Sequence, residues 1–221
     1  MHRSLSRYFI SITLVVVLLT GTSIGIVSNM HKSNAASLQP NTIPAQVSGG
    51  VSHSLALLPD GTVWAWGSNQ YGQLGNKDVV TTITVSGNTI SASSTPVQVS
   101  DLTDITAISA GGGHNLAVKN NGTVWAWGVN YDGQLGDGTT ADSNAPVQVM
   151  ISLTMPLTDI IAISAGAFHN LALKSDGTVW AWGSNGLGLL GNGTTDNSST
   201  PVQVNGLTSV IAIARPELIT V

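Results

Sequence analysis

The chain has 221 residues, a formal net charge of −4 and no cysteine. The absence of cysteine excludes disulfide scaffolds, thiolate chemistry and cysteine-based zinc sites. After residue 36 only four basic residues face eleven acidic ones, a balance of −7, and this argues against nucleic-acid binding, which needs Lys or Arg at the phosphates.

Residues 1–36 have the pattern of an export signal. Arg3 and Arg7 precede residues 8–27, which carry no charge, and small residues follow at 33–36. A basic start, an apolar stretch and small residues are typical of a cleaved signal peptide. Twenty uncharged residues can also span a bilayer, so an uncleaved membrane anchor is the alternative. Either form predicts an extracellular or cell-surface location, with membrane contact only through this segment if it stays uncleaved.

A seven-residue phrase, Gly-Thr-Val-Trp-Ala-Trp-Gly, occurs at residues 61–67, 122–128 and 177–183 and contains all six tryptophans. Before each copy stand a Gly-rich turn, a histidine and an alternating apolar run, which an Asp-Gly or Asn-Gly pair joins to the phrase. Such a pair is a strong hairpin signal, because both residues tolerate the positive φ of a tight turn. Each copy therefore predicts two antiparallel strands, with both tryptophans on one face.

Two more segments recur after each phrase. A Gly-Gln-Leu-Gly loop follows at residues 72–75 and 133–136, with Leu189 in place of Gln in the third copy, and a Pro-Val-Gln-Val segment then begins at Pro96, Pro146 and Pro201. A final alternating segment leads to the next Gly-rich turn. Each unit thus predicts four short strands and shows no helical periodicity. Four-stranded units at intervals of about 50 residues are typical of propeller blades.

With these motifs the chain resembles the RCC1 repeat family, named for the regulator of chromosome condensation, over residues 43–213. The resemblance implies an all-β fold. We expect a partial RCC1-like β-propeller of three four-stranded antiparallel blades plus the first strand of a fourth, preceded by an N-terminal hydrophobic helix. The predicted repeats span residues 43–104, 105–159 and 160–209, and residues 210–221 form the truncated start of a fourth. Family propellers are seven-bladed, so a homo-oligomer that completes the ring is a further expectation.

The copies depart from one another at two places. The first copy carries an insertion with a hairpin-like, uncharged stretch at residues 82–90, which predicts either a projecting recognition hairpin or a disordered decoration. Near the C-terminus, Arg215 and Pro216 stand where a fourth Gly-rich turn is expected. This second departure indicates a truncated product.

Few side chains have the arrangement that catalysis or metal binding requires. The three histidines of the repeats, His53, His114 and His169, occupy equivalent places in separate copies, so we expect each to fix its own Gly-rich turn by a hydrogen bond rather than to ligate a metal. The chain's single Glu, Glu217, leaves no basis for a facing carboxylate pair. We therefore predict no enzymatic activity, no catalytic residue, no metal site and no cofactor.

The resemblance implies a protein-binding platform, since family members act in nucleotide exchange on a small GTPase, as ubiquitin-ligase accessory domains and as a secreted β-lactamase inhibitor. We predict an exported, non-enzymatic protein–protein interaction module, with inhibitor-like binding of an extracellular enzyme as its most concrete form. The alternatives are a guanine-nucleotide exchange factor-like regulator and a truncated structural module of a larger cell-surface protein. The predicted partner is another protein, of unknown identity, and not nucleic acid.

Contact residues are expected where the near-identical copies differ. The loop after each Trp strand carries Gln70 and Tyr71 in the first copy, Tyr131 and Asp132 in the second, and Leu187 in the third. Variation on a fixed scaffold is where binding specificity can be encoded. These five residues are the candidate protein-binding residues.

Overall fold

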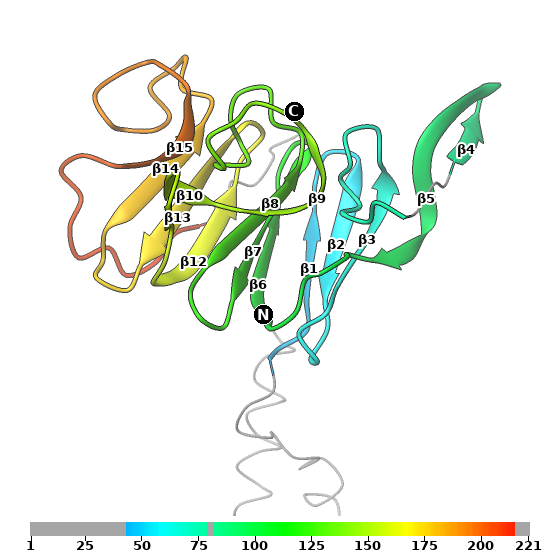
Figure 1. The fold of residues 1–221 in the computed structure, drawn as a ribbon, viewed down its shortest axis with the longest axis horizontal. Coiled ribbons are helices and arrows are strands. Elements are labelled where there is room, and N and C mark those ends of the chain that lie inside the picture. Colours follow the sequence, from blue (N-terminus) through cyan, green and yellow to red (C-terminus); the bar gives the residue numbers. More distant parts are fainter. Residues whose placement is uncertain (1–42, 79–81, 215–221) are drawn as a thin grey trace, which may run out of the picture. The chain divides into compact units, whose positions relative to one another are not determined.

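The computed structural model describes residues 43–78 and 82–214. The predicted signal peptide or anchor and the predicted N-terminal helix lie outside these ranges, as do residues 215–221. Within the described ranges there is no helix, and so none that could cross a membrane. All regular structure there is antiparallel β-sheet, which confirms the all-β prediction (Figure 1).

Three sheets, which we call blades 1 to 3, follow one another along the chain. Their strand orders are β1-β2-β3-β5-β4, β6-β7-β8-β9 and β12-β13-β14-β15, and a two-stranded ribbon, β10-β11, follows blade 2. The bounds are β1 (Gln46–Gly49), β2 (His53–Leu57), β3 (Val63–Ser68), β4 (Thr82–Val85), β5 (Asn88–Gln98), β6 (Ile105–Ala110), β7 (His114–Lys119), β8 (Val124–Gly128), β9 (Ser143–Gln148), β10 (Met150–Ser152), β11 (Met155–Pro156), β12 (Ile160–Ala165), β13 (His169–Lys174), β14 (Val179–Gly183) and β15 (Ser198–Gln203).

The predicted His–Trp hairpin is present in each blade. In blade 1, Ala56 lies opposite Trp64 and Ser54 opposite Trp66. The turn between β2 and β3 is closed locally, because the Asp60 carboxylate accepts hydrogen bonds from the backbone N–H and the hydroxyl of Thr62, at 3.0 and 2.6 Å. Gly61 adopts a φ of 79°, which a residue with a side chain rarely tolerates. Local turn chemistry therefore sets the register of the hairpin.

The blades stack through unlike faces. The apolar face of blade 1, with Leu55, Leu57 and Val63, forms one buried cluster with Trp127 of blade 2, and blade 2 packs on Trp182 of blade 3 in the same way. Trp127 and Trp182 are fully buried. Trp66, the equivalent residue of blade 1, is only half-buried, because no blade covers its face within the described residues. The second tryptophan of each Trp strand in blades 2 and 3 is thus buried by the preceding blade.

Each repeat histidine bonds its own Gly-rich turn, as predicted, but it does so through the backbone carbonyl and not through the ring. The Gly-rich turn is closed by the backbone, with Gly50 N–H donating to the His53 carbonyl at 2.8 Å. The His53 ring instead reaches the next blade, where its Nε2 is 2.7 Å from Asn115 Oδ1. Since the Asn115 amide donates through Nδ2 to the Gln73 carbonyl at 2.9 Å, its Oδ1 is the acceptor and His53 Nε2–H the donor.

The same pairing locks blade 2 to blade 3. His114 Nε2 is 2.7 Å from Asn170 Oδ1, and Asn170 Nδ2 donates to the Gln134 carbonyl at 2.8 Å. The Trp182 indole N–H donates to that same carbonyl at 2.9 Å. We call this set of His, Asn, Gln and Trp the interblade lock. Because its members are buried, each polar group needs the others, and the lock fixes one geometry between neighbouring blades.

Candidate functional site

The loop that follows each Trp strand is held by a single asparagine. Asn130 N–H donates to Asp142, its side-chain N–H groups donate to the carbonyls of Thr139 and Ala141, and its Oδ1 accepts from Leu135 N–H at 2.8 Å. Asn69 Oδ1 and Asn185 Oδ1 accept the equivalent bond in blades 1 and 3, at 3.0 and 2.9 Å, from Leu74 and Leu190. The loops therefore share one backbone course, and the two residues after each asparagine are free to vary.

A glutamine side chain accepts a hydrogen bond from the backbone of the second residue after each of these asparagines in blades 1 and 2. Gln73 Oε1 accepts from Tyr71 N–H, and Gln134 Oε1 accepts from Asp132 N–H, both at 2.9 Å. In blade 3 this glutamine is Leu189, which offers no such acceptor. Fixed backbone amides leave the side chains of Tyr71 and Asp132 available for contact with their surroundings.

Two of the predicted contact residues meet across the junction of blades 1 and 2. The rings of Tyr71 and Tyr131 lie edge to face, with centroids 5.8 Å apart and planes at 87°. Tyr131 is 63% exposed and Tyr71 38% exposed. Edge-to-face contact is a favoured geometry of aromatic pairs, and it orders two exposed rings on the surface.

The other predicted residues are placed differently. Gln70 lies beside Tyr71, and both line a polar groove that is described below. Asp132 points toward blade 3, where its carboxylate accepts from Asn197 Nδ2 at 2.8 Å. Leu187, in the loop of blade 3, is 90% exposed and does not line the groove. The structure therefore brings Tyr71 and Tyr131 into contact, places Gln70 on the groove that Tyr71 also lines, and gives Asp132 an interblade contact.

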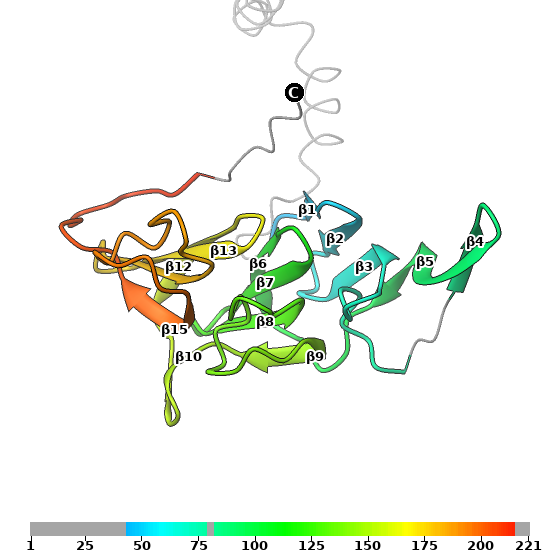
Figure 2. The ribbon, with the colours of Figure 1, turned by 90° about the horizontal axis from the view of Figure 1, so that it is seen from above.

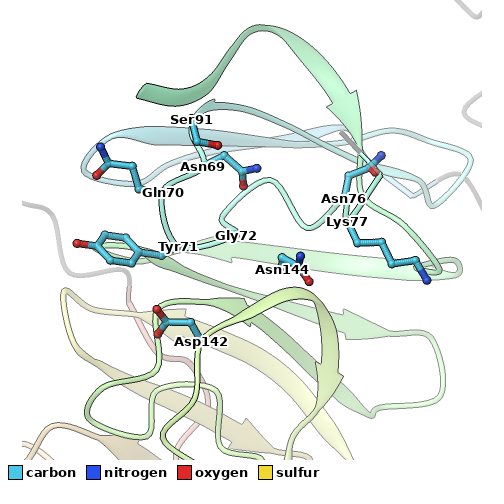
Figure 3. A pocket seen from close by; sticks show the side chains of 9 residues that line it. All are labelled: Asn69, Gln70, Tyr71, Gly72, Asn76, Lys77, Ser91, Asp142 and Asn144. Atoms are coloured by element: carbon cyan, nitrogen blue, oxygen red, sulfur yellow. The ribbon is translucent and has the colours of Figure 1, made fainter. Parts of the chain in front are cut away.

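A polar groove of about 520 Å³ opens beside Tyr71 (Figure 3). One wall is the loop after β3, and the facing wall is the segment that leads into β9 of blade 2. Sequence reasoning missed most of the lining, although the residues opposite each loop also differ between copies. The lining residues are Asn69, Gln70, Tyr71, Gly72, Asn76, Lys77, Ser91, Asp142 and Asn144.

The equivalent place between blades 2 and 3 is bridged. There the Asp132–Asn197 bond spans the junction, and Gly138 N–H donates to the Ser199 carbonyl at 2.9 Å. At the junction of blades 1 and 2, Tyr71 stands in the place of Asp132 and Asp142 in the place of Asn197, and no hydrogen bond joins these two in the described residues. The residues at these two positions thus allow a side-chain hydrogen bond at the junction of blades 2 and 3 that the junction of blades 1 and 2 lacks.

The groove surface carries both signs of charge. Lys77 Nζ lies 4.0 Å from Asp101, and both side chains are well exposed, so this ion pair contributes little. Desolvation, together with the nearby Asp142 carboxylate and Tyr71, raises the pKa of Tyr131, which therefore stays a neutral hydroxyl at physiological pH. In the described part of the chain, no three His, Asp or Glu side chains gather where they could hold a metal ion. The arrangement suits hydrogen bonding and aromatic contact.

Comparison with known proteins agrees with this architecture. The family model of the regulator of chromosome condensation (RCC1) repeat matches residues 60–118, 121–173 and 176–215, and a second model of the same repeat matches residues 45–73, 105–134 and 160–189. Among curated relatives, the human probable E3 ubiquitin-protein ligase HERC6 is 38% identical over 170 residues, which cover 76% of this chain and 15% of the relative. The human probable E3 ubiquitin-protein ligase HERC3 is 35% identical over 161 residues, covering 72% of this chain and 14% of the relative.

Solved structures give the same result. Human WBSCR16 is similar with a TM-score of 0.59 at 27% identity, over 72% of this chain and 38% of that one. Prp20p from Saccharomyces cerevisiae is similar in fold with a TM-score of 0.57 at 22% identity, over 72% and 37%. The chain thus spans about a seventh of these curated relatives and under two fifths of these solved chains. Since the family model matches well over half of the residues and the blades stack as described, the chain belongs to the regulator of chromosome condensation (RCC1) repeat family.

Proposed function

We propose that this chain is an exported, non-enzymatic protein-interaction module that docks a partner protein on the tyrosine rim, by which we mean Gln70, Tyr71 and Tyr131 with the adjoining groove. The observation that carries the proposal is the exposed Tyr71–Tyr131 pair, which joins two blades. Tyrosine is enriched among the residues that dominate binding energy at protein interfaces. A polar groove beside an aromatic anchor resembles the polar rim that surrounds such residues.

The family relation supports the same reading. The propeller fold of this family is a protein-interaction fold, and yeast Prp20 binds Gsp1p, histones and Kap60. For this chain we propose protein binding in general, and none of those particular partners. Export rests on the basic and apolar pattern of residues 1–36, and it places the partner outside the cytoplasm, with an extracellular enzyme as the most concrete candidate.

The partner can be captured at the rim itself. A photo-crosslinking amino acid is placed at Tyr71 or Tyr131 of the full chain in its source cells, with Leu187, the exposed residue of the corresponding loop in blade 3, as the control position. We expect one distinct protein adduct from each tyrosine position and none from the control. Adducts from Leu187 alone would contradict the proposal. An adduct with a small GTPase whose nucleotide release the chain accelerates would instead support the exchange-factor alternative.

The captured partner then allows a quantitative test. The double variant Y71A/Y131A should weaken binding by about 2 kcal/mol or more, roughly 30-fold in Kd, as expected for anchoring aromatic residues. A second variant, Y71D/D142N, recreates the Asp132–Asn197 bond at the junction of blades 1 and 2 and should close the groove with little effect on stability. Calorimetric titration that finds both variants binding as tightly as the original chain would refute docking at this rim.

A further inference from the structure

Blade 1 carries a hairpin that blades 2 and 3 lack. β4 and the first half of β5 pair as an antiparallel ribbon, with Ile83 opposite Ile90 and Thr84 opposite Thr89. Their turn is a tight two-residue loop in which Ser86 and Gly87 have φ values of 51° and 84°. Both views show this ribbon extending away from the rest of the blade (Figures 1 and 2). The predicted hairpin is therefore present in the structure.

The ribbon has a free edge without the usual protection. β4 is the last strand of the sheet order, and its outer edge has no partner strand in the described ranges. Exposed edges are normally blocked by Lys, Pro, a bulge or an inward-pointing charge. β4 has none of these, and no charged residue occurs between residues 82 and 100. An isolated two-stranded ribbon is also marginally stable in water, and a third strand would stabilise it.

The two faces of the ribbon differ in a way that suits pairing with itself. Ile83 and Ile90 share one face and are half-buried, whereas Thr82, Thr84 and Thr89 share the other face and are exposed. Two β4 strands can pair antiparallel about a two-fold axis that passes between the two copies of Ile83, which then lie opposite each other. An apolar stripe of four side chains then crosses the joined ribbons, made of Ile83 and Ile90 from each copy. Thr82 then faces Thr84 of the second copy. No like charges meet in this register.

We propose that β4 is a self-association edge, and that two copies of this chain pair through it as an antiparallel, two-fold dimer. Pairing would extend the five-stranded sheet of blade 1 continuously into that of the second copy. A two-fold contact of this kind is self-complementary and closes at two subunits. β4 does not line the groove of the tyrosine rim, although Ser91, which lies opposite Thr82 in the ribbon, does, so dimerisation and the proposed partner binding use adjacent but different residues and are tested separately.

The absence of cysteine provides a direct test of this register. Residues directly opposite in an antiparallel pair have Cα atoms about 4.5–5.5 Å apart, within the range that a disulfide can bridge. The full-length I83C variant should therefore form a covalent dimer under mild oxidation. The matched T89C variant, on the inner strand of the same ribbon, should remain monomeric in the same treatment, and equal crosslinking of the two variants would overturn the register.

Sedimentation velocity of the full chain tests the dimer without crosslinking. We expect a species of twice the monomer mass that grows with concentration, and the T84K variant, with a charge on the outer edge, should be monomeric over the same series. T89K serves as the control and should still dimerise. The proposal fails if the original chain stays monomeric throughout. It also fails if association survives T84K, or if a charge at Leu207, an exposed residue after β15 of blade 3, abolishes association while T84K does not.

Discussion

The interblade lock predicts an unusually large effect for one small substitution, Asn170→Ala. The Asn170 side chain is fully buried between blades 2 and 3, where Oδ1 accepts from His114 Nε2–H at 2.7 Å and Nδ2 donates to the Gln134 carbonyl at 2.8 Å. Truncation to Ala removes both bonds. The Gln134 carbonyl keeps its bond from Trp182, but the His114 N–H is left buried without an acceptor.

The expected loss follows from these contacts. The two lost hydrogen bonds contribute about 1 kcal/mol each, and the stranded buried donor costs about 1–3 kcal/mol more, so the free energy of unfolding should fall by roughly 3–5 kcal/mol. Ser54 provides the matched control, because it holds the same register position in blade 1 and makes no side-chain hydrogen bond in the described residues. Ser54→Ala should change the free energy of unfolding by no more than about 0.5 kcal/mol.

Urea denaturation followed by tryptophan fluorescence measures both variants. Trp182 belongs to the lock, so its emission should report the opening of the junction between blades 2 and 3. A loss below about 1 kcal/mol for Asn170→Ala would refute the reasoning, because it would mean that water or a shifted ring satisfies the His114 N–H at little cost. Similar losses for Asn170→Ala and Ser54→Ala would also refute it, since only one of them belongs to a lock.

Two further predictions rest on the same junctions. Burial lowers the pKa of His114 from 6.5 to about 4, so this ring is harder to protonate in the folded chain than in the unfolded chain. The free energy of unfolding should therefore be constant above pH 6.5 and fall by up to about 3 kcal/mol as the pH drops toward 4. A urea midpoint that does not change over this range would contradict the prediction. Gly72→Ala should destabilise the chain by about 1–3 kcal/mol more than Gly188→Ala in thermal unfolding: both positions have positive φ, but a Cβ at Gly72 would lie 2.5 Å from the Asn144 Cα, whereas nothing lies within 4 Å at Gly188. Equal losses would show that the φ strain alone decides.

The hairpins could be predicted from the sequence because their determinants are local. Asp60 and Gly61 shape the turn, and alternation then decides which residues share a face, so the pairing of Ala56 with Trp64 requires no knowledge of the other blades. The interblade lock had a weaker signal that sequence reasoning missed. Asn follows His at residues 115 and 170, but Ser54 follows His53 in the first copy, whose Trp face has no blade against it in the described residues. The asparagine is thus present where a preceding blade supplies a histidine.

The tyrosine rim could be predicted only in part. Alignment of the copies places Tyr131 at the position of Gln70 and Asp132 at the position of Tyr71, so nothing in the repeat suggests that Tyr71 and Tyr131 touch. Their contact depends on how far one blade is rotated against the next, and the buried lock sets that rotation through residues distant in sequence. The groove was missed for the same reason, since Asp142 and Asn144 belong to the following blade.

Buried residues hold the blades together, and exposed loop residues form the surface, so the surface residues can differ between blades without affecting the stacking. The lock fixes the blades, and Asn69 and Gln73 fix the loop backbone, so the side chains of Gln70 and Tyr71 have no structural task in blade 1. A change there alters the surface without changing the stacking. Asp132 shows the limit of this freedom, because its bond to Asn197 bridges a junction that Tyr71 leaves open. The surface that we propose for binding on blade 1 therefore consists of loop side chains that the packing of the blades does not use.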